Sequence, residues 1–265
     1  MAARVWSETA GDPVGPLIAA VHGSMDRSAG LLRLSRHLDG EHRVLRYDRR
    51  GYGRSTEVGP PWTAESNIDD LERLLVDSSA TPATPATVFG HSYGGNVALG
   101  LAVRRPDLVR AVIVYETPLS WLTWWPQDSA GAAAMAQEDP GDAAEAFMRR
   151  LVGDSVWERL PASKRAERRS EGRAMVAELA DLRRSAPWTA DRIGVPVLAL
   201  YGEDARPHHR RAMQGLGDTI ADCRSVMVAG AGHAGPHTHA VAVAVAVESF
   251  LRAISLQPLQ APDAD

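Results

Sequence analysis

The sequence contains a single cysteine, Cys223, so no second thiol is present with which to form an intrachain disulfide. We therefore expect a reducing, cytoplasmic setting, and a metal site built from several cysteines is excluded. Long apolar segments are also scarce. The longest unbroken apolar run, residues 240–247, is far shorter than the roughly 20 residues that a membrane-spanning helix needs. Residues 1–6 hold no apolar stretch of signal-peptide length, which favours the same setting.

An excess of positive charge is lacking as well, because the net charge is −4 and the pI is near 6.1. Nucleic acids and anionic membranes attract basic surfaces, so we expect neither as the main partner and expect a small-molecule substrate instead. Hydrophobic residues make up 45% of the 265 residues and charged residues 23%, which indicates a folded globular protein. The oligomeric state does not follow from these quantities.

Short apolar runs alternate with helical stretches along much of the chain. This alternation is the pattern of a parallel sheet covered by helices, and Gly, Pro or polar residues bound each run, as they bound buried strands. The predicted strands are residues 17–21, 43–47, 87–89, 111–115, 196–201 and 225–228. Helices are expected at residues 63–77, 93–103 and 241–253. The predicted fold class is α/β, with a mostly parallel, doubly wound sheet.

Residues 119 to about 188 contain no convincing strand, yet they hold five of the seven tryptophans. We interpret residues 119–186 as a helical cap inserted into a core of residues 1–118 and 187–256, with residues 257–265 as a flexible tail. Trp121, Trp124 and Trp125 directly follow a predicted strand, at the end where sites in such sheets open. They either pack the cap on the core or line a substrate pocket.

The strongest chemical signal is the segment Gly90-His91-Ser92-Tyr93-Gly94-Gly95. It follows a predicted strand and opens a predicted helix, which is the context of a nucleophilic serine on a strained turn. The flanking glycines let neighbouring backbone segments approach, and the helix N-terminus favours developing negative charge. Ser92 is therefore the predicted nucleophile.

A serine hydroxyl needs a base, and His233 is the candidate. It follows Gly230-Ala231-Gly232 late in the chain, as the order serine, acid, histidine requires. Two N–H groups must hold the oxyanion. We expect them from Tyr93, the residue after the nucleophile, and from Ser24 in the loop after the first long strand. His22 in that loop has a structural role in this interpretation.

In their order and spacing these motifs resemble those of a capped α/β-hydrolase. They are His22-Gly23, the loop from Asp48 to Ser55, the segment around Ser92 and Gly232-His233. The resemblance covers roughly residues 15–118 and 187–254. It implies a sheet of the α/β-hydrolase type with the cap inserted after the sixth strand. It also implies that the loop at residues 48–55 is a structural turn without a catalytic role.

The third member of the triad is where this sequence departs from the family pattern. Most members carry the acid three residues after the glycine that ends the penultimate strand, and Ala205 occupies that position here. If the local loop is shifted, Asp204 or Glu203 could serve instead.

The competing candidate is Glu116, which ends an apolar strand just before Thr117-Pro118. Some relatives, including haloalkane dehalogenases and zearalenone-lactone hydrolases, place a glutamate there. A buried carboxylate needs a partner, which His233 or an arginine of the cap would supply. We favour Glu116 as the acid and keep Asp204 as the alternative.

Together these residues predict a serine hydrolase that cleaves a carboxylic ester or lactone with a Ser-His-Glu triad and needs no metal or organic cofactor. The tryptophan-rich cap suggests a bulky or aromatic substrate. A serine nucleophile argues against epoxide hydrolase or haloalkane dehalogenase chemistry. The same triad could cleave a thioester or a carbon–carbon bond or run cofactor-free perhydrolysis. The fold could also serve a non-hydrolytic cyclase, an isomerase or a ligand-sensing receptor.

Overall fold

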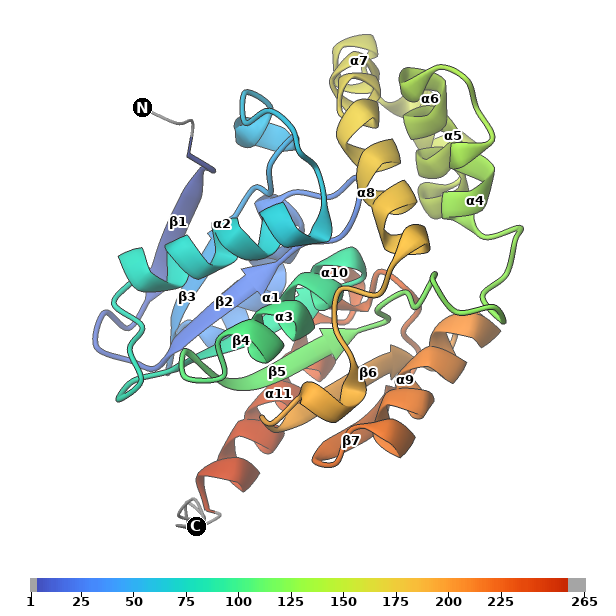
Figure 1. Ribbon diagram of the computed structural model, residues 1–265. Helices are drawn as coiled ribbons and strands as arrows, with labels where there is room; N and C mark the ends of the chain where they lie inside the picture. The colour runs from blue at the N-terminus through green and yellow to red at the C-terminus, as the bar shows by residue number, and fades with distance from the viewer. Residues whose placement is uncertain (1–3, 257–265) are drawn as a thin grey trace.

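The computed structural model describes residues 4–256, and their seven strands form one sheet in the order β1-β3-β2-β4-β5-β6-β7 (Figure 1). Only β1 pairs antiparallel, with β3, so the predicted α/β class with a mostly parallel sheet is confirmed. The strands are β1 (Ser7–Gly11), β2 (Leu17–Val21), β3 (Arg43–Tyr47), β4 (Ala86–His91), β5 (Val109–Tyr115), β6 (Val197–Gly202) and β7 (Cys223–Val228).

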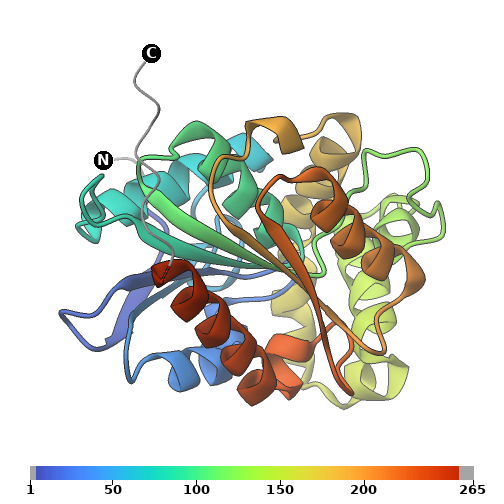
Figure 2. The same cartoon turned by 90° about the horizontal axis from the view of Figure 1, so that it is seen from below.

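Helices cover both faces of this sheet (Figure 2). The apolar side chains of α1 (Leu32–Leu38) and α11 (Ala240–Ser255) join one buried cluster with the sheet residues of that face. Those of α2 (Ala64–Asp77), α3 (Tyr93–Arg104) and α9 (Pro207–Thr219) join the cluster on the other face. A short helix, α10 (Gly235–Thr238), precedes α11. Burial on both faces explains why the central strands read as unbroken apolar runs.

All six predicted strands are present, and one strand was missed. The missed strand is β1, an exposed edge strand of sequence Ser7-Glu8-Thr9-Ala10-Gly11, which has no apolar face for a sequence pattern to reveal. The prediction that the cap follows the sixth strand was wrong in the strand number. The cap follows β5, the fifth strand of the described chain, and two more strands, β6 and β7, come after it.

The Val-Ala repeat at residues 240–247 forms a helix despite its period of two. In α11 the side chains of Val243, Val247 and Phe250 are buried at helical spacing, whereas Val241 and Val245 are exposed. Alternation in sequence therefore coincides with one buried stripe of a helix. Within residues 4–256, no helix combines the length and the apolar character required to cross a membrane.

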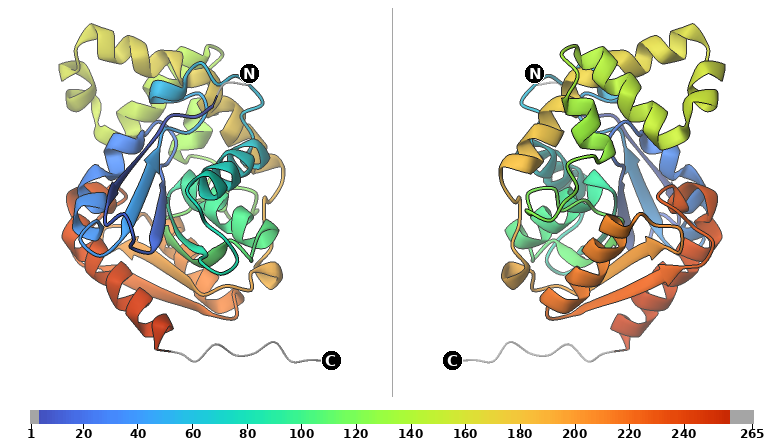
Figure 3. Two further views of the ribbon diagram at one scale, coloured as in Figure 1. Left: turned by 90° about the vertical axis from the view of Figure 1, so that its left-hand side faces the viewer. Right: turned by 90° about the vertical axis from the view of Figure 1, so that its right-hand side faces the viewer.

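Between β5 and β6 the described chain forms no strand, and its five α-helices lie together beyond one end of the sheet (Figure 3). These helices are α4 (Ala130–Met135), α5 (Pro140–Val152), α6 (Asp154–Arg159), α7 (Ala162–Ser170) and α8 (Gly172–Arg184). We call them the cap helices. The proposed tail at residues 257–265 lies outside the described residues.

A buried ion pair joins the cap helices to the loop at residues 48–55. Arg49 of that loop and Glu178 of α8 lie 2.7 Å apart between Nη1 and Oε2, and both side chains are almost fully buried. The Glu178 carboxylate also accepts hydrogen bonds from the hydroxyls of Ser24 and Tyr52. The loop is thus a structural support beside the site, in line with its expected role.

Replacing Glu178 with alanine is expected to lower the free energy of unfolding by about 3–5 kcal/mol. The reason is that the substitution leaves the buried Arg49 guanidinium without its counter-charge. Urea unfolding followed by circular dichroism measures the change. Glu138→Ala is the matched control, because Glu138 is an exposed residue between α4 and α5. This variant should leave the unfolding midpoint unchanged. Equal midpoints for the two variants would contradict a stabilising role for the pair.

Candidate active site

The register of the sheet brings three loops to one edge. Val21 of β2 pairs with Gly90 of β4, and His91 of β4 pairs with Tyr115 of β5, so the residues that follow these strands emerge side by side. Strand order reverses between β2 and β4, because β3 lies on the far side of β2. Sites in parallel α/β sheets open at such a switch point, beyond the carboxyl ends of the strands.

Ser92 lies at the tight turn between β4 and α3. Its backbone has φ 52° and ψ −124°, a left-handed conformation that is rare for a residue other than glycine, and its N–H donates to the carbonyl of Tyr115 at 2.8 Å. A Cβ atom on Gly23 would come within 2.9 Å of the Cβ of Ser92. Glycine at position 23 therefore allows the loop after β2 to approach the serine.

His233 is bonded to the side chain of Glu116. The ring Nδ1 of His233 and Oε2 of Glu116 are 2.8 Å apart, which assigns the Nδ1 proton to the imidazole and leaves Nε2 facing away from the carboxylate. The preceding residue is held in place by the hydroxyl of Tyr115, which donates to the carbonyl of Gly232 at 2.8 Å. Burial lowers the pKa of His233 below its ordinary value, although the hydrogen bond to Glu116 opposes this shift.

Glu116 has no exposed surface and directly follows β5. Its second carboxylate oxygen, Oε1, accepts the N–H of Gly202 at 3.0 Å, so both oxygens have partners. Its backbone also adopts positive φ, 46°. The burial of this charge is therefore compensated by one backbone donor and one imidazole donor.

The alternative acids lie in the loop after β6. Glu203 and Asp204 are both exposed, and the Glu203 side chain accepts the N–H of Gly230 at 2.8 Å. Among residues 4–256, neither side chain forms a hydrogen bond or ion pair with His233. The geometry thus pairs the imidazole with Glu116 and leaves the loop of Asp204 outside this contact.

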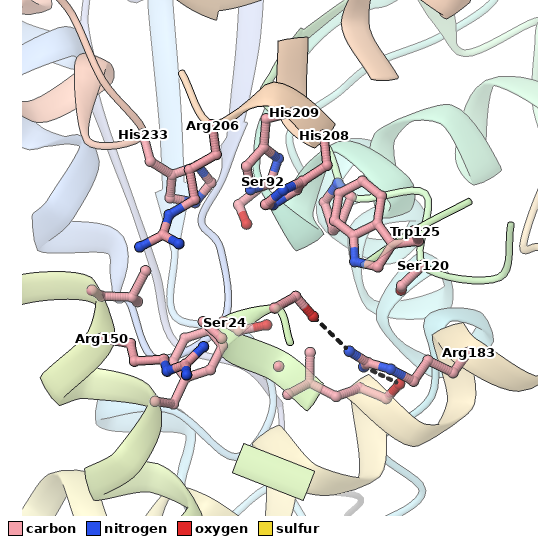
Figure 4. A pocket seen from close by; sticks show the side chains of 17 residues that line it. Ser24, Ser92, Ser120, Trp125, Arg150, Arg183, Arg206, His208, His209 and His233 are labelled. Carbon is pink, nitrogen blue, oxygen red and sulfur yellow. Dashed lines mark hydrogen bonds between the residues drawn. The ribbon is translucent and has the colours of Figure 1, made fainter. Parts of the chain in front are cut away.

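Ser24, Ser92 and His233 line one cavity between the sheet edge and the cap helices (Figure 4). In the described part of the chain, the Ser92 hydroxyl forms no hydrogen bond to the imidazole, although both side chains face this cavity. Within the same residues, the backbone N–H groups of Ser24 and Tyr93 donate to no protein acceptor. Two free amide donors therefore flank the serine, one of them at the N-terminus of α3.

Both ring nitrogens of His22 contact backbone groups of the neighbouring loops. Its Nε2 accepts the N–H of Arg49 at 2.9 Å, and its Nδ1 lies 2.8 Å from the carbonyl of Gly23. Burial, reinforced by the nearby Arg49 guanidinium, lowers the pKa of His22 to about 3, so the ring is neutral. These contacts fit the structural role expected from the sequence.

The three tryptophans of the predicted substrate pocket divide between two places. Trp125 lines the cavity that contains Ser92. Trp121 and Trp124 line a separate pocket with Trp188, against α9. The structure therefore does not bring Trp121 and Trp124 to the serine, because the turn after β5 directs them away from it.

Several cavity residues were not identified from the sequence. His209 stacks on His233 with ring centroids 4.7 Å apart, and Trp125 packs edge-on against both His208 and His209. Burial lowers the pKa of His209 well below its ordinary value, so this ring is neutral beside His233. The two adjacent histidines lie a few residues beyond Ala205, the position where the family usually carries its acid. Their closeness to that position was the signal in the sequence that could have placed them at the site.

Glu116, His209 and His233 offer ligand atoms that lie within 4.8 Å of one another. Imidazole and carboxylate are ligands that zinc accepts in proteins. The bond between Glu116 and His233 already uses the facing atoms of those two groups, however, and a metal ion there would have to replace it. We therefore assign no metal ion to this cluster.

These features define the class of protein. A model of the alpha/beta hydrolase family matches residues 18–247, which is most of the chain. The chain therefore belongs to the alpha/beta hydrolase family.

In sequence, it is similar to the lipase LipV of Mycobacterium tuberculosis, with 34% identity over 142 residues that cover 53% of this chain and 52% of LipV. In structure, it is similar to a thermophilic esterase from Thermogutta terrifontis, with a TM-score of 0.74 and 24% identity over 94% of this chain and 93% of the other. An enol-lactonase from Burkholderia xenovorans has a TM-score of 0.71 and 24% identity over 94% and 96% of the two chains. At this level of identity, the structural likeness shows a shared fold. The chain spans about half the length, or less, of the first curated relatives that it matches.

Proposed function

We propose that this protein is a serine hydrolase that cleaves a carboxylic ester or lactone by a Ser-His-Glu triad. The observation that carries the proposal is the 2.8 Å bond between Glu116 and the Nδ1 of His233, whose imidazole lines the same cavity as Ser92 on its strained turn. Membership of the alpha/beta hydrolase family supports the reaction class. The names of the similar lipase, esterase and enol-lactonase agree with an ester or lactone bond.

In the proposed reaction, the Ser92 oxygen attacks the substrate carbonyl while Nε2 of His233 takes the hydroxyl proton. The N–H groups of Ser24 and Tyr93 bind the oxyanion of the tetrahedral intermediate. His233 then passes its proton to the departing alcohol, which leaves an acyl group on Ser92. Water, deprotonated by the same imidazole, releases the acid and restores the serine. Glu116 stabilises the imidazolium in both halves of the cycle.

The cavity also supports a substrate with an apolar or aromatic portion. Trp125, Phe147, Leu151 and Leu179 line it, so apolar side chains face the same cavity as the serine and histidine groups. Apolar surface of this kind binds substrate by burial, and the few polar groups orient it. Neutral His209 beside His233 adds no charge that would oppose formation of the imidazolium.

A fluorophosphonate probe should label the wild-type protein, and the label should be absent from Ser92→Ala, because only an activated serine reacts with it. In-gel fluorescence measures the labelling. Ser120→Ala is the control, since Ser120 lines the same cavity and has no role in the triad. Labelling that survives in Ser92→Ala and disappears in another serine variant would show that Ser92 is not the nucleophile. A folded wild-type protein that never reacts would argue for a non-hydrolytic role.

The identity of the acid is tested by comparing Glu116→Gln with Asp204→Asn. Glutamine retains the size of the side chain but cannot stabilise the imidazolium, so ester turnover should fall roughly 10³–10⁴-fold in Glu116→Gln. Asp204→Asn should stay within a few fold of wild type, because its exposed side chain does not contact His233. If Asp204→Asn alone loses turnover while both variants unfold at the wild-type temperature, Asp204 is the acid.

The pH dependence of kcat/KM should report the titration of His233, which must be neutral to act as the base. Its pKa lies below the ordinary value of 6.5 because of burial; the hydrogen bond to Glu116 opposes this shift, and the charge of Arg206 reinforces it. Activity should therefore rise with pH and reach half of its plateau below pH 6.5. Glu116→Gln should move the midpoint lower, since the raising contribution is lost. A midpoint above pH 7 in the wild type would contradict this environment for His233.

A further inference from the structure

The cavity that contains Ser92 is lined by side chains of one sign of charge. Three arginines line it, Arg150, Arg183 and Arg206, and no Asp or Glu is among its lining residues. They come from three places: α5, α8 and the residue that precedes α9. In Figure 4, Arg206 and Arg150 lie on one side of the view and Arg183 on the other, with the Ser92 hydroxyl between them.

Arg183 is the most enclosed of the three. Its guanidinium donates to the Ser129 hydroxyl at 3.2 Å and to the Leu179 carbonyl at 3.3 Å, and it contacts the sulfur of Met135. Among the described residues, it forms no ion pair. Burial lowers its pKa, as expected for a cation without a carboxylate partner. Leaving a half-buried guanidinium uncompensated is costly, so the site favours a negative charge from another source.

Arg150 and Arg206 are also free of carboxylate partners within residues 4–256. Arg150 donates to a backbone carbonyl, that of Asp128. No protein acceptor takes a side-chain hydrogen bond from Arg206 in this part of the chain. Its guanidinium is exposed and directed toward the cavity in Figure 4.

The arginines next in sequence to two of the cavity arginines do form ion pairs with carboxylates. Arg149, beside Arg150, pairs with Glu145, Asp154 and Glu158 on the outside of the cap helices. Arg184, beside Arg183, pairs with Asp181 at 2.7 Å. Carboxylates are therefore abundant on the cap helices, yet all of those that pair with arginine lie outside the cavity. The absence of acids along the cavity is a property of the site and not of the surrounding sequence.

We propose that the substrate carries a free carboxylate in addition to the ester or lactone that is cleaved, and that Arg183, Arg150 and Arg206 select it. This inference rests on the proposed function for the identity of the scissile bond. Guanidinium matches a carboxylate through two parallel N–H donors, and the partly enclosed cavity strengthens the attraction relative to bulk water. The apolar side chains that line the cavity, among them Trp125 and Phe147, then contact the carbon skeleton that joins the two groups.

Matched ester pairs that differ only in charge test the selectivity. One pair is 3-acetoxybenzoate and 3-acetoxybenzamide, with the charge on the leaving side. The other is monomethyl adipate and the methyl ester of adipic acid monoamide, with the charge on the acyl side. In at least one pair, kcat/KM should be roughly 10- to 100-fold higher for the anion, as expected for a charge-assisted contact. The preference should shrink as salt is raised to about 0.5 M.

Substitutions assign the preference to the arginines. Arg183→Gln and Arg206→Gln should each reduce roughly tenfold the ratio of kcat/KM for the anion to kcat/KM for its neutral partner, mainly by raising KM for the anion. Arg184→Gln and Arg149→Gln are the matched controls and should retain the full preference. Because Arg206 is exposed, its variant remains informative if Arg183→Gln unfolds.

A binding measurement separates this inference from the proposed reaction. Calorimetry with Ser92→Ala and the two pairs of intact esters should show, in at least one pair, binding of the neutral amide that is at least tenfold weaker than binding of the anion, whatever the chemistry at Ser92. Wild-type protein that hydrolyses neutral and anionic esters equally well, with no difference in binding, overturns the carboxylate while the hydrolase proposal stands. Failure to hydrolyse any ester, with selective binding retained, overturns the hydrolase proposal alone.

Discussion

The geometry of the candidate site depends on the hydrogen bond between the buried carboxylate of Glu116 and the imidazole of His233. A charge without solvent contact is tolerated only where donors surround it, and here the donors are the imidazole and the N–H of Gly202. The carboxylate thereby connects the ends of β5 and β6 to the loop after β7. The imidazole can reach the cavity of Ser92 because this connection holds its ring in one orientation and one tautomer.

A second buried carboxylate, that of Glu178, has the corresponding role for the cap helices. It accepts from Ser24, whose backbone N–H is proposed to bind the oxyanion, and from Tyr52, and it pairs with Arg49. The same helix, α8, carries Arg183 on the surface that lines the cavity. The cap helices are therefore fixed to the loop beside the serine, and the proposed selectivity and the proposed chemistry share one rigid support.

The charge of the cavity differs in sign from the net charge of the whole chain. The whole chain has a net charge of −4, yet the cavity is lined by arginine and histidine without acids, and neutral His209 stacks on His233. Net charge governs solubility and long-range attraction, whereas the field inside a partly enclosed site is set by the few groups that face it. A mildly acidic protein can therefore offer a cationic site to a small anion.

The sequence by itself determined the α/β sheet and most strand positions, and it predicted Ser92 and His233 as candidates, because apolar runs and a serine on a strand-to-helix turn are local patterns. It favoured Glu116 as the acid but kept Asp204 as the alternative, since the choice depends on which strand end faces the imidazole. The tertiary structure decided the rest: the pairing of His233 with Glu116, the assignment of Trp125 to one pocket and of Trp121 and Trp124 to another, and the gathering of three distant arginines. Each of these depends on the direction of a side chain and the register of neighbouring elements, which spacing along one chain does not encode.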